Sequence, residues 1–271
     1  MADETGRIIG VRGANLWVEE AGTGSTVVLV HSGITDARMW DDQWAALAAG
    51  HHVIRYDLRG YGRSSIPPQP FTHHDDLLGL FNALGVESAA LVAASMGGEV
   101  ALAFTLEHPE RVRRLVLVNT LAGTDSRSEE LRAGWREMER AFDAGGLDAA
   151  VEIELRMWVD GPRRSPADVD PGLRERVRMM DHALLAREAE QELASEGQPN
   201  RPTLDYLHEI DVPTLVISGA LDMPDALVSA QHLQLAIPGA IAYEFANAAH
   251  LPNLECAAEF TTTVGGFLAE P

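Results

Sequence analysis

The segment Leu91–Gly98, with the sequence LVAASMGG, is the part of the chain that decides the fold. An apolar run typical of a buried strand ends on Ser95, and a helical pattern begins directly after it. A tight turn from strand to helix holds its central residue in a strained backbone conformation, which only small neighbours such as Ala93 and Gly97 tolerate. The segment therefore predicts a serine hydroxyl exposed at the carboxyl end of a sheet. The alternative is a close helix–strand contact without a chemical role.

Strand and helix patterns alternate on both sides of this segment. Two polar, alternating runs predict an N-terminal hairpin at 7–11 and 16–20. Apolar runs predict buried strands at 27–30, 52–56, 89–92 and 115–118, and further strands at 214–218 and 241–245. Helical patterns occupy 40–49, 73–84, 97–108, 225–237 and 257–268. This order predicts an α/β fold with a mostly parallel eight-stranded sheet and helices on both of its faces.

The residues between 121 and 207 interrupt the alternation. They contain no strand pattern, and their apolar residues recur at helical spacing, as in the stripe Leu131, Trp135, Met138 and Phe142. We therefore predict a helical cap at 121–207, inserted between the first part of the core at 1–120 and the second part at 208–271.

Composition limits the classes of partner. The formal net charge of −20 would repel nucleic acid and anionic membrane surfaces, so we expect neither as a partner. The single cysteine, Cys256, cannot form an intramolecular disulfide, and the N-terminus lacks the pattern of a signal peptide. We expect a cytoplasmic protein that acts on a small molecule. Whether it forms a homodimer is left open.

A loop of small residues follows the predicted strand 27–30. In it, the backbone N–H of Gly33 can face Ser95 and, with the N–H of Met96, form an oxyanion hole. Losing one such donor costs enzymes roughly 3 kcal/mol of transition-state stabilisation. We interpret the side chain of His31 as a structural group that hydrogen-bonds this loop. The alternative is an ordinary strand-to-helix turn.

An acid and a histidine follow the last two predicted strands. Asp222 comes after strand 214–218, and His250 comes after strand 241–245. Parallel strands would bring both to the sheet edge that carries Ser95. A neutral serine is a poor nucleophile, so it needs a base within hydrogen-bonding distance and a carboxylate that orients this base. Asp125, beyond strand 115–118, is the alternative acid.

The chain order Ser, Asp, His with a strand–turn–helix serine resembles the α/β-hydrolase family over residues 7–268. Three further segments are similar to family motifs: HSG at 31–33, DLRGYGRS at 57–64 and AHLPNLE at 249–255. The loop at 31–40 looks most like that of 3-oxoadipate enol-lactonases and small-ester hydrolases. Two departures are Ala93, where the family commonly has glycine, and Ala94, where it commonly has histidine or glutamine.

The resemblance implies a serine hydrolase that cleaves a carboxylic ester or lactone of a small to medium, largely apolar substrate. Ser95 would be the nucleophile, His250 the base and Asp222 the orienting acid, with no cofactor and no metal. One alternative is a cofactor-free haloperoxidase, perhydrolase or carbon–carbon bond hydrolase that uses the same residues. The other alternative is a protein that binds a small ligand without turning it over.

Several residues remain to be assigned. We expect four apolar residues to contact the substrate, namely Ile34, Met157, Trp158 and Leu251. The pairs His51–His52 and His73–His74 are interpreted as surface residues, because no Cys or carboxylate cluster accompanies them. Asp57 and Arg59 are expected to hold their glycine-punctuated turn in place, and Cys256 is expected to pack at the start of the last helix.

Overall fold

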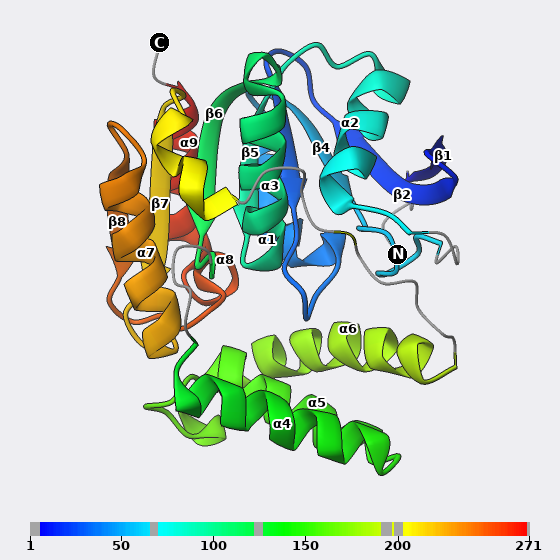
Figure 1. Ribbon diagram of the computed structural model, residues 1–271, viewed down its shortest axis with the longest axis vertical. Coiled ribbons are helices and arrows are strands. Elements are labelled where there is room, and N and C mark those ends of the chain that lie inside the picture. Colours follow the sequence, from blue (N-terminus) through cyan, green and yellow to red (C-terminus); the bar gives the residue numbers. More distant parts are fainter. Residues whose placement is uncertain (1–5, 66–69, 122–126, 191–196, 198–202, 270–271) are drawn as a thin grey trace.

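The sheet of this protein has eight strands in the order β1-β2-β4-β3-β5-β6-β7-β8 (Figure 1). The computed structural model describes residues 6–65, 70–121, 127–190, 197 and 203–269. β2 pairs antiparallel with β1 and β4, and every other neighbouring pair is parallel. The strands are β1 (Arg7–Val11), β2 (Ala14–Ala21), β3 (Thr26–Val30), β4 (His52–Tyr56), β5 (Ala89–Ala94), β6 (Val112–Val118), β7 (Thr214–Gly219) and β8 (Ile241–Phe245). The predicted mostly parallel, eight-stranded sheet is confirmed.

Helices cover both faces of the sheet, because successive side chains of a strand point to opposite faces. In β5, Val92 packs with α1 and α9, whereas Leu91 packs with α2, α3 and α7. The helices of this core are α1 (Asp41–Ala48), α2 (His73–Leu84), α3 (Met96–Glu107), α7 (Pro224–Ala236), α8 (Pro252–Glu255) and α9 (Ala257–Ala269). Short 3-10 helices occupy Ala37–Trp40, Pro109–Arg111, Pro166–Asp168 and Thr203–Glu209.

Three α-helices and a π-helical segment lie among the described residues between β6 and β7, and we call residues 127–190 the cap. They are α4 (Glu129–Asp143), α5 (Leu147–Glu154), the π segment Leu155–Asp160 and α6 (Pro171–Glu190). Figure 1 shows these helices beyond one end of the sheet, clear of both faces that the core helices cover. Leu131 of the predicted apolar stripe is fully buried, and Trp135, Met138 and Phe142 pack against the same core cluster.

Polar contacts fix the cap to the core at separate points. Arg187 of α6 donates to the backbone oxygens of Gly62 and Ser64, at 2.5 and 2.7 Å. At the other end, the hydroxyl of Ser128 donates to Asp225 of α7 at 2.5 Å. None of the described helices is both long and apolar enough to span a bilayer.

The histidine pairs were only partly predicted. His51 and His52 are partly exposed, but His73 and His74 are each 3% exposed, so the surface interpretation is wrong for this second pair. The ring of His73 lies edge-on to Phe71, with 5.0 Å between centroids, and burial lowers its pKa to about 3. The cause is the position of these residues in the first turn of α2, which packs on the sheet.

Candidate active site

Ser95 occupies the tight turn between β5 and α3, as its sequence predicts. Its backbone has φ 52° and ψ −118°, a conformation that is unfavourable for a residue with a side chain. The turn is held by the Ser95 N–H, which donates to the Val118 oxygen at 2.7 Å. A Cβ on Gly97 would lie 2.4 Å from the oxygen of His31, so glycine is required by close packing there.

Ser95, His250 and Asp222 form a continuous chain of hydrogen bonds. His250 Nε2 lies 2.8 Å from Ser95 Oγ, and His250 Nδ1 lies 2.6 Å from Asp222 Oδ2. Asp222 is 0% exposed and His250 is 2% exposed, so water does not compete for the bond between them. In this arrangement the imidazole can accept the proton of the serine hydroxyl while the carboxylate stabilises the resulting cation.

Asn119, directly after β6, joins the loops that carry the acid and the histidine. Its side-chain NH₂ donates to the oxygens of Ala249 and His250 at 3.0 and 2.9 Å. Its side-chain oxygen accepts from the Gly219 N–H at 3.1 Å. Asn119 was not predicted from the sequence, although a polar residue directly after a buried strand was a usable signal. Its backbone φ of 44° is one that asparagine adopts more readily than most residues.

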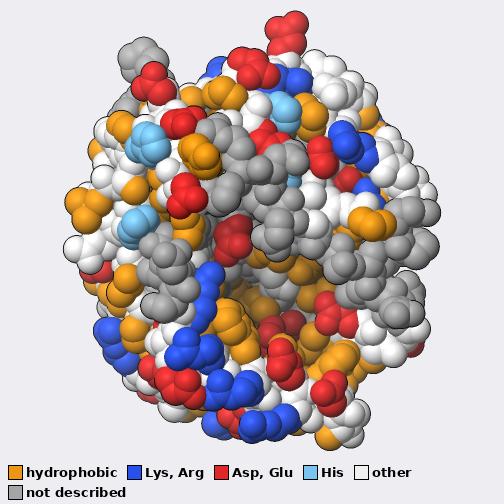
Figure 2. All heavy atoms as spheres, viewed as in Figure 1, with side chains coloured by type: hydrophobic (Ala, Val, Ile, Leu, Met, Phe, Trp, Pro, Cys, Tyr) orange, Lys and Arg blue, Asp and Glu red, His pale blue; other side chains and the backbone are white. Residues whose placement is uncertain are grey.

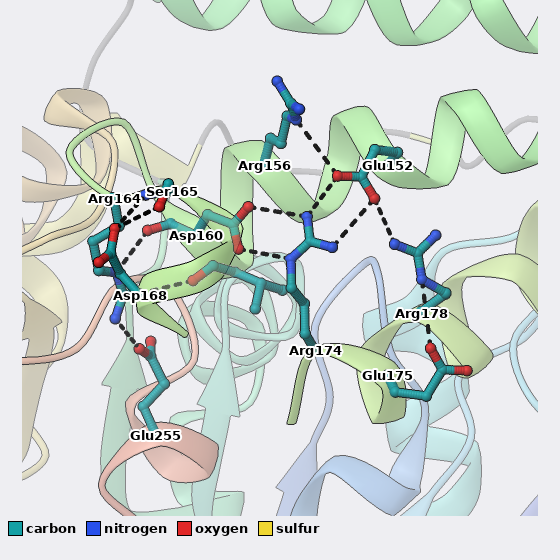
Figure 3. A network of polar contacts seen from close by, with 11 residues as sticks. Glu152, Arg156, Asp160, Arg164, Ser165, Asp168, Arg174, Glu175, Arg178 and Glu255 are labelled. Atoms are coloured by element: carbon teal, nitrogen blue, oxygen red, sulfur yellow. Dashed lines mark hydrogen bonds and ion pairs between the residues drawn. The ribbon is translucent and has the colours of Figure 1, made fainter. Parts of the chain in front are cut away.

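A second set of bonds ties the histidine loop to the cap. Glu255 accepts from the Ala249 N–H at 2.7 Å and from Arg164 of the cap at 2.6 Å (Figure 3). The His250 N–H donates to the oxygen of Trp158 in the π segment at 3.3 Å. The rings of Trp158 and His250 lie 4.5 Å apart. The position of the imidazole thus depends on both the core and the cap.

The two predicted oxyanion donors lie next to each other. A Cβ on Gly33 would be 3.8 Å from the Cβ of Met96, and both residues line the same cavity. Met96 is the first residue of α3, where backbone N–H groups lack partners within the helix. His31 has the structural place expected of it. Its Nε2 accepts from the Leu58 N–H at 2.9 Å and its Nδ1 lies 2.8 Å from the Ser32 oxygen, while burial lowers its pKa.

A cavity of about 390 Å³ opens above Ser95, between the core and the cap. The hollow is visible in Figure 2, with hydrophobic and acidic side chains around it. Its apolar wall consists of Ile34, Leu121, Trp135 and Trp158, and its charged residues are Glu99, Arg127 and Glu154. Ile34 and Trp158 are therefore where the sequence analysis expected them.

Met157 and Leu251, which were also expected to contact substrate, do not line this cavity. Met157 faces α4, where a Cβ on Gly134 would lie 2.6 Å from its sulfur. Leu251 is 1% exposed and packs in the core cluster. Both are neighbours in sequence of cavity residues, and the expectation failed because adjacent residues point in different directions.

The remaining candidates have structural surroundings. Asp57 accepts from the backbone N–H groups of Ala37 and Arg63, at 2.9 and 2.8 Å, so it pins its loop. Arg59 pairs instead with Asp76 at 2.6 Å. Cys256 lies between α8 and α9, partly buried, and burial raises the pKa of its thiol.

A metal site and the alternative acid remain to be considered. Within the described ranges, no group of three or more His, Cys, Asp or Glu side chains is arranged to hold a metal ion. Asp125, the alternative acid, lies outside the described residues.

Comparison with known proteins identifies the family. The family model described as alpha/beta hydrolase fold matches residues 25–256, and the chain belongs to this family. A 2-hydroxymuconate semialdehyde hydrolase from Pseudomonas sp. (strain CF600) is 31% identical, over 98% of this chain and 95% of that protein.

Two solved structures extend the comparison. The enol-lactonase from Burkholderia xenovorans LB400 has a TM-score of 0.78 at 31% identity, covering 97% of this chain and 100% of that one. A thermophilic esterase from Thermogutta terrifontis has a TM-score of 0.80 at 29% identity, covering 97% of both chains. The chain is thus a hydrolase-family member whose relatives differ in the bond that they cleave.

Proposed function

We propose that this protein is a serine hydrolase that cleaves a carboxylic ester or lactone through an acyl-enzyme. The observation that carries the proposal is the chain of hydrogen bonds from Ser95 Oγ through His250 to Asp222, at 2.8 and 2.6 Å. The strained turn at Ser95 and the cavity above it add support, because they present the hydroxyl to a bound substrate.

In the proposed reaction, Ser95 Oγ attacks the carbonyl carbon while His250 Nε2 takes the hydroxyl proton. The oxyanion of the tetrahedral intermediate accepts hydrogen bonds from the N–H groups of Gly33 and Met96. His250 then gives its proton to the leaving alkoxide, and the C–O bond breaks. Water, deprotonated by His250, attacks the acyl-enzyme and releases the acid. Asp222 keeps the imidazole in the required tautomer throughout.

The size and lining of the cavity support a small to medium substrate. A volume of about 390 Å³ lies near the lower end of the range found for small-molecule sites, roughly 300 to 1,000 Å³. Two indoles and two aliphatic side chains form its apolar wall. The likeness to an enol-lactonase and to an esterase supports the same bond classes.

The test is turnover of p-nitrophenyl esters and simple lactones by the wild type and Ser95→Ala. We expect the variant to lose roughly 10³-fold or more of kcat, by analogy with other serine hydrolases. A fluorophosphonate probe should label the wild type and not the variant. Equal activity of both proteins, or binding of small apolar ligands without labelling, would contradict the proposal.

A second candidate is hydrolysis of a carbon–carbon bond by the same residues. It is favoured by the full-length likeness to a 2-hydroxymuconate semialdehyde hydrolase. To distinguish the two candidates, kcat/KM is measured for 2-hydroxymuconate semialdehyde and for the esters and lactones on one enzyme preparation. A kcat/KM for the semialdehyde well above that for every ester and lactone would favour the second candidate.

A further inference from the structure

One part of the cavity wall contains a buried carboxyl group that is backed by a second one, which is not itself among the lining residues. Glu154, the last residue of α5, lines the cavity and is 8% exposed. Its neighbour is Asp181 of α6, which is 0% exposed. Asp181 and Glu154 are joined by a side-chain hydrogen bond, and neither carboxylate oxygen of Asp181 has another partner within the described part of the chain. A buried carboxyl whose bond is to a second carboxyl is costly, which suggests that Glu154, at the cavity surface, is kept for a ligand.

The pair retains a proton because two buried carboxylates cannot both ionise readily. Burial, followed by the charge of Glu188, raises the pKa of Glu154 to about 7. Burial, followed by the charge of Glu154, raises the pKa of Asp181 to about 9. Near pH 7 the two groups therefore share a proton and together carry less than one negative charge, which grows as the pH rises. They belong to no cluster arranged to hold a metal within the described residues.

The rest of the cavity does not cancel this charge. Among the described lining residues, Arg127 is the only arginine or lysine, and its positive charge acts on Glu99, which also lines the cavity. The indoles of Trp135 and Trp158 line the same cavity as Glu154. An electron-rich indole face attracts a cation, and a carboxylate in a dehydrated site attracts it more strongly than one in water.

We propose that the Glu154–Asp181 pair, together with Trp135 and Trp158, binds a positively charged ammonium group of the substrate. The proposal rests on the proposed function, because it places this group within reach of Ser95 in one cavity. The net charge of −20 would favour the encounter with a cationic substrate. On binding, the ammonium group replaces the shared proton, which leaves to solvent.

The test uses three p-nitrophenyl esters of similar size. The acyl groups are 4-(trimethylammonio)butyrate, its neutral carbon analogue 5,5-dimethylhexanoate, and the anionic half-ester of glutaric acid. We expect the cationic ester to have the highest kcat/KM, roughly tenfold or more above the neutral one, with the anionic ester the poorest. Preference for the anionic ester would mean that Arg127 dominates, and would overturn the proposal.

Two substitutions assign the effect to the pair. Glu154→Gln should lower the ratio of cationic to neutral kcat/KM by roughly tenfold, because it removes the charge and keeps the shape. Glu152→Gln is the matched control, since Glu152 lies on the same helix but its charge already faces Arg174 and Arg178. An equal fall of the ratio in both variants would contradict a specific site at Glu154. Thermal unfolding of each variant checks that it is folded.

The pH dependence of the same ratio gives an independent readout. In the wild type the ratio should rise between about pH 6 and pH 8.5, as the pair loses its proton. In Asp181→Asn the rise should lie in the same pH range, because burial and Glu188 still raise the pKa of Glu154 and the amide N–H replaces the Asp181 donor, whereas in Glu154→Gln the rise should be absent. The other charged groups around the pair are Glu188 and Arg178 of α6 and, in the cavity lining, Glu99, Arg127 and His250. A change at the catalytic residues acts on all three esters alike and cancels in the ratio.

Failure of the proposed function is distinguishable from failure of this inference. If no ester is cleaved and Ser95 is not labelled, the hydrolase proposal fails. Calorimetry with phenyltrimethylammonium, and with tert-butylbenzene as its neutral analogue, then still tests the site. Tighter binding of the cation, lost in Glu154→Gln, would support the inference, and equal binding of both compounds would overturn it.

Discussion

The core side and the cap side of the cavity hold their buried carboxyl groups in different ways. On the core side, the acid Asp222 has both oxygens engaged, by His250 at 2.6 Å and by the Met223 N–H at 2.7 Å. On the cap side, Asp181 is just as deeply buried, but its bond is to a second acid, Glu154, which lines the cavity. A carboxyl with two N–H donors is held in one position, whereas a pair of acids holds a proton that a cationic ligand can replace.

The same contrast occurs within one helix of the cap. Glu152 and Glu154 lie two residues apart on α5, on different sides of the helix. Figure 3 shows Glu152 facing Arg174 and Arg178, and these arginines lower its pKa to about 2. Glu154 faces the cavity and Asp181 instead, and its pKa is raised to about 7. The residue type is identical, so the difference comes from what each side of the helix meets.

The largest expected effect is on the core wall, with Asp222→Asn. The amide leaves the fold intact but favours the wrong imidazole tautomer, and the analogous change in another triad enzyme lowers kcat by about 10⁴-fold. The measurement is kcat for a p-nitrophenyl ester, with Asp125→Asn as the comparison. If Asp222→Asn left kcat unchanged and Asp125→Asn lowered it strongly, the acid would be Asp125 and not Asp222.

A smaller effect is expected for the positioning residue Asn119. Asn119→Ala removes the bridge between the loops of Asp222 and His250, and a misplacement of about 1 Å can cost on the order of 10²-fold in rate. We expect kcat to fall roughly tenfold to a hundredfold, with KM changing much less. Asn119→Asp keeps the acceptor for Gly219 but turns a carboxylate oxygen toward the oxygens of Ala249 and His250, so kcat should fall at least as far as in Asn119→Ala.

A purely structural role for Asn119 would give a different result. In that case both variants would lower the melting temperature and leave kcat and the pH profile of kcat/KM at wild-type values. A shift of that profile, with fluorophosphonate labelling slowed in proportion to kcat, would assign Asn119 to the positioning of His250.

The smallest effect concerns stability and the pair on the cap wall. The pKa of Asp181 is about 9 in the folded protein against 3.8 for an unperturbed aspartate. The folded state therefore binds this proton more tightly than the unfolded state, and the free energy of unfolding falls as the pH rises between these values. Asp181→Asn should be more stable than the wild type by about 1 kcal/mol near pH 8.5, with a smaller difference near pH 5.

Glu152→Gln should change the free energy of unfolding in the opposite direction in the same assay. Its pKa of about 2 lies below 4.5, the ordinary value, so its stabilising contribution is present above 4.5 and is lost as the pH falls through 2. Because Glu152 is about one-third exposed, the loss at neutral pH should be only about 0.5 kcal/mol. Urea unfolding of both variants across this pH range measures both effects. A destabilised Asp181→Asn at high pH would contradict the comparison of the two walls.

Local patterns in the sequence were enough to predict the fold and three residues of the site. The alternation of apolar runs and helical stripes predicted every strand of the sheet, because strand and helix periods are properties of the chain itself. The turn at Ser95 was recognisable because its backbone tolerates only small neighbours. Asp222 and His250 followed from their positions after two late strands, since parallel strands end at one edge of a sheet.

The tertiary structure alone decided which side chains meet on the cap and around the loops. Nothing in the sequence pairs Glu154 with Asp181, or distinguishes Glu154 from Glu152, because the contacts of a helix depend on the segments packed against it. The bridge made by Asn119 joins carbonyls 130 and 131 residues further along the chain, beyond the range of any local pattern. The side chains of Met157 and Leu251 point away from the cavity for the same physical reason: packing between distant segments determines their direction.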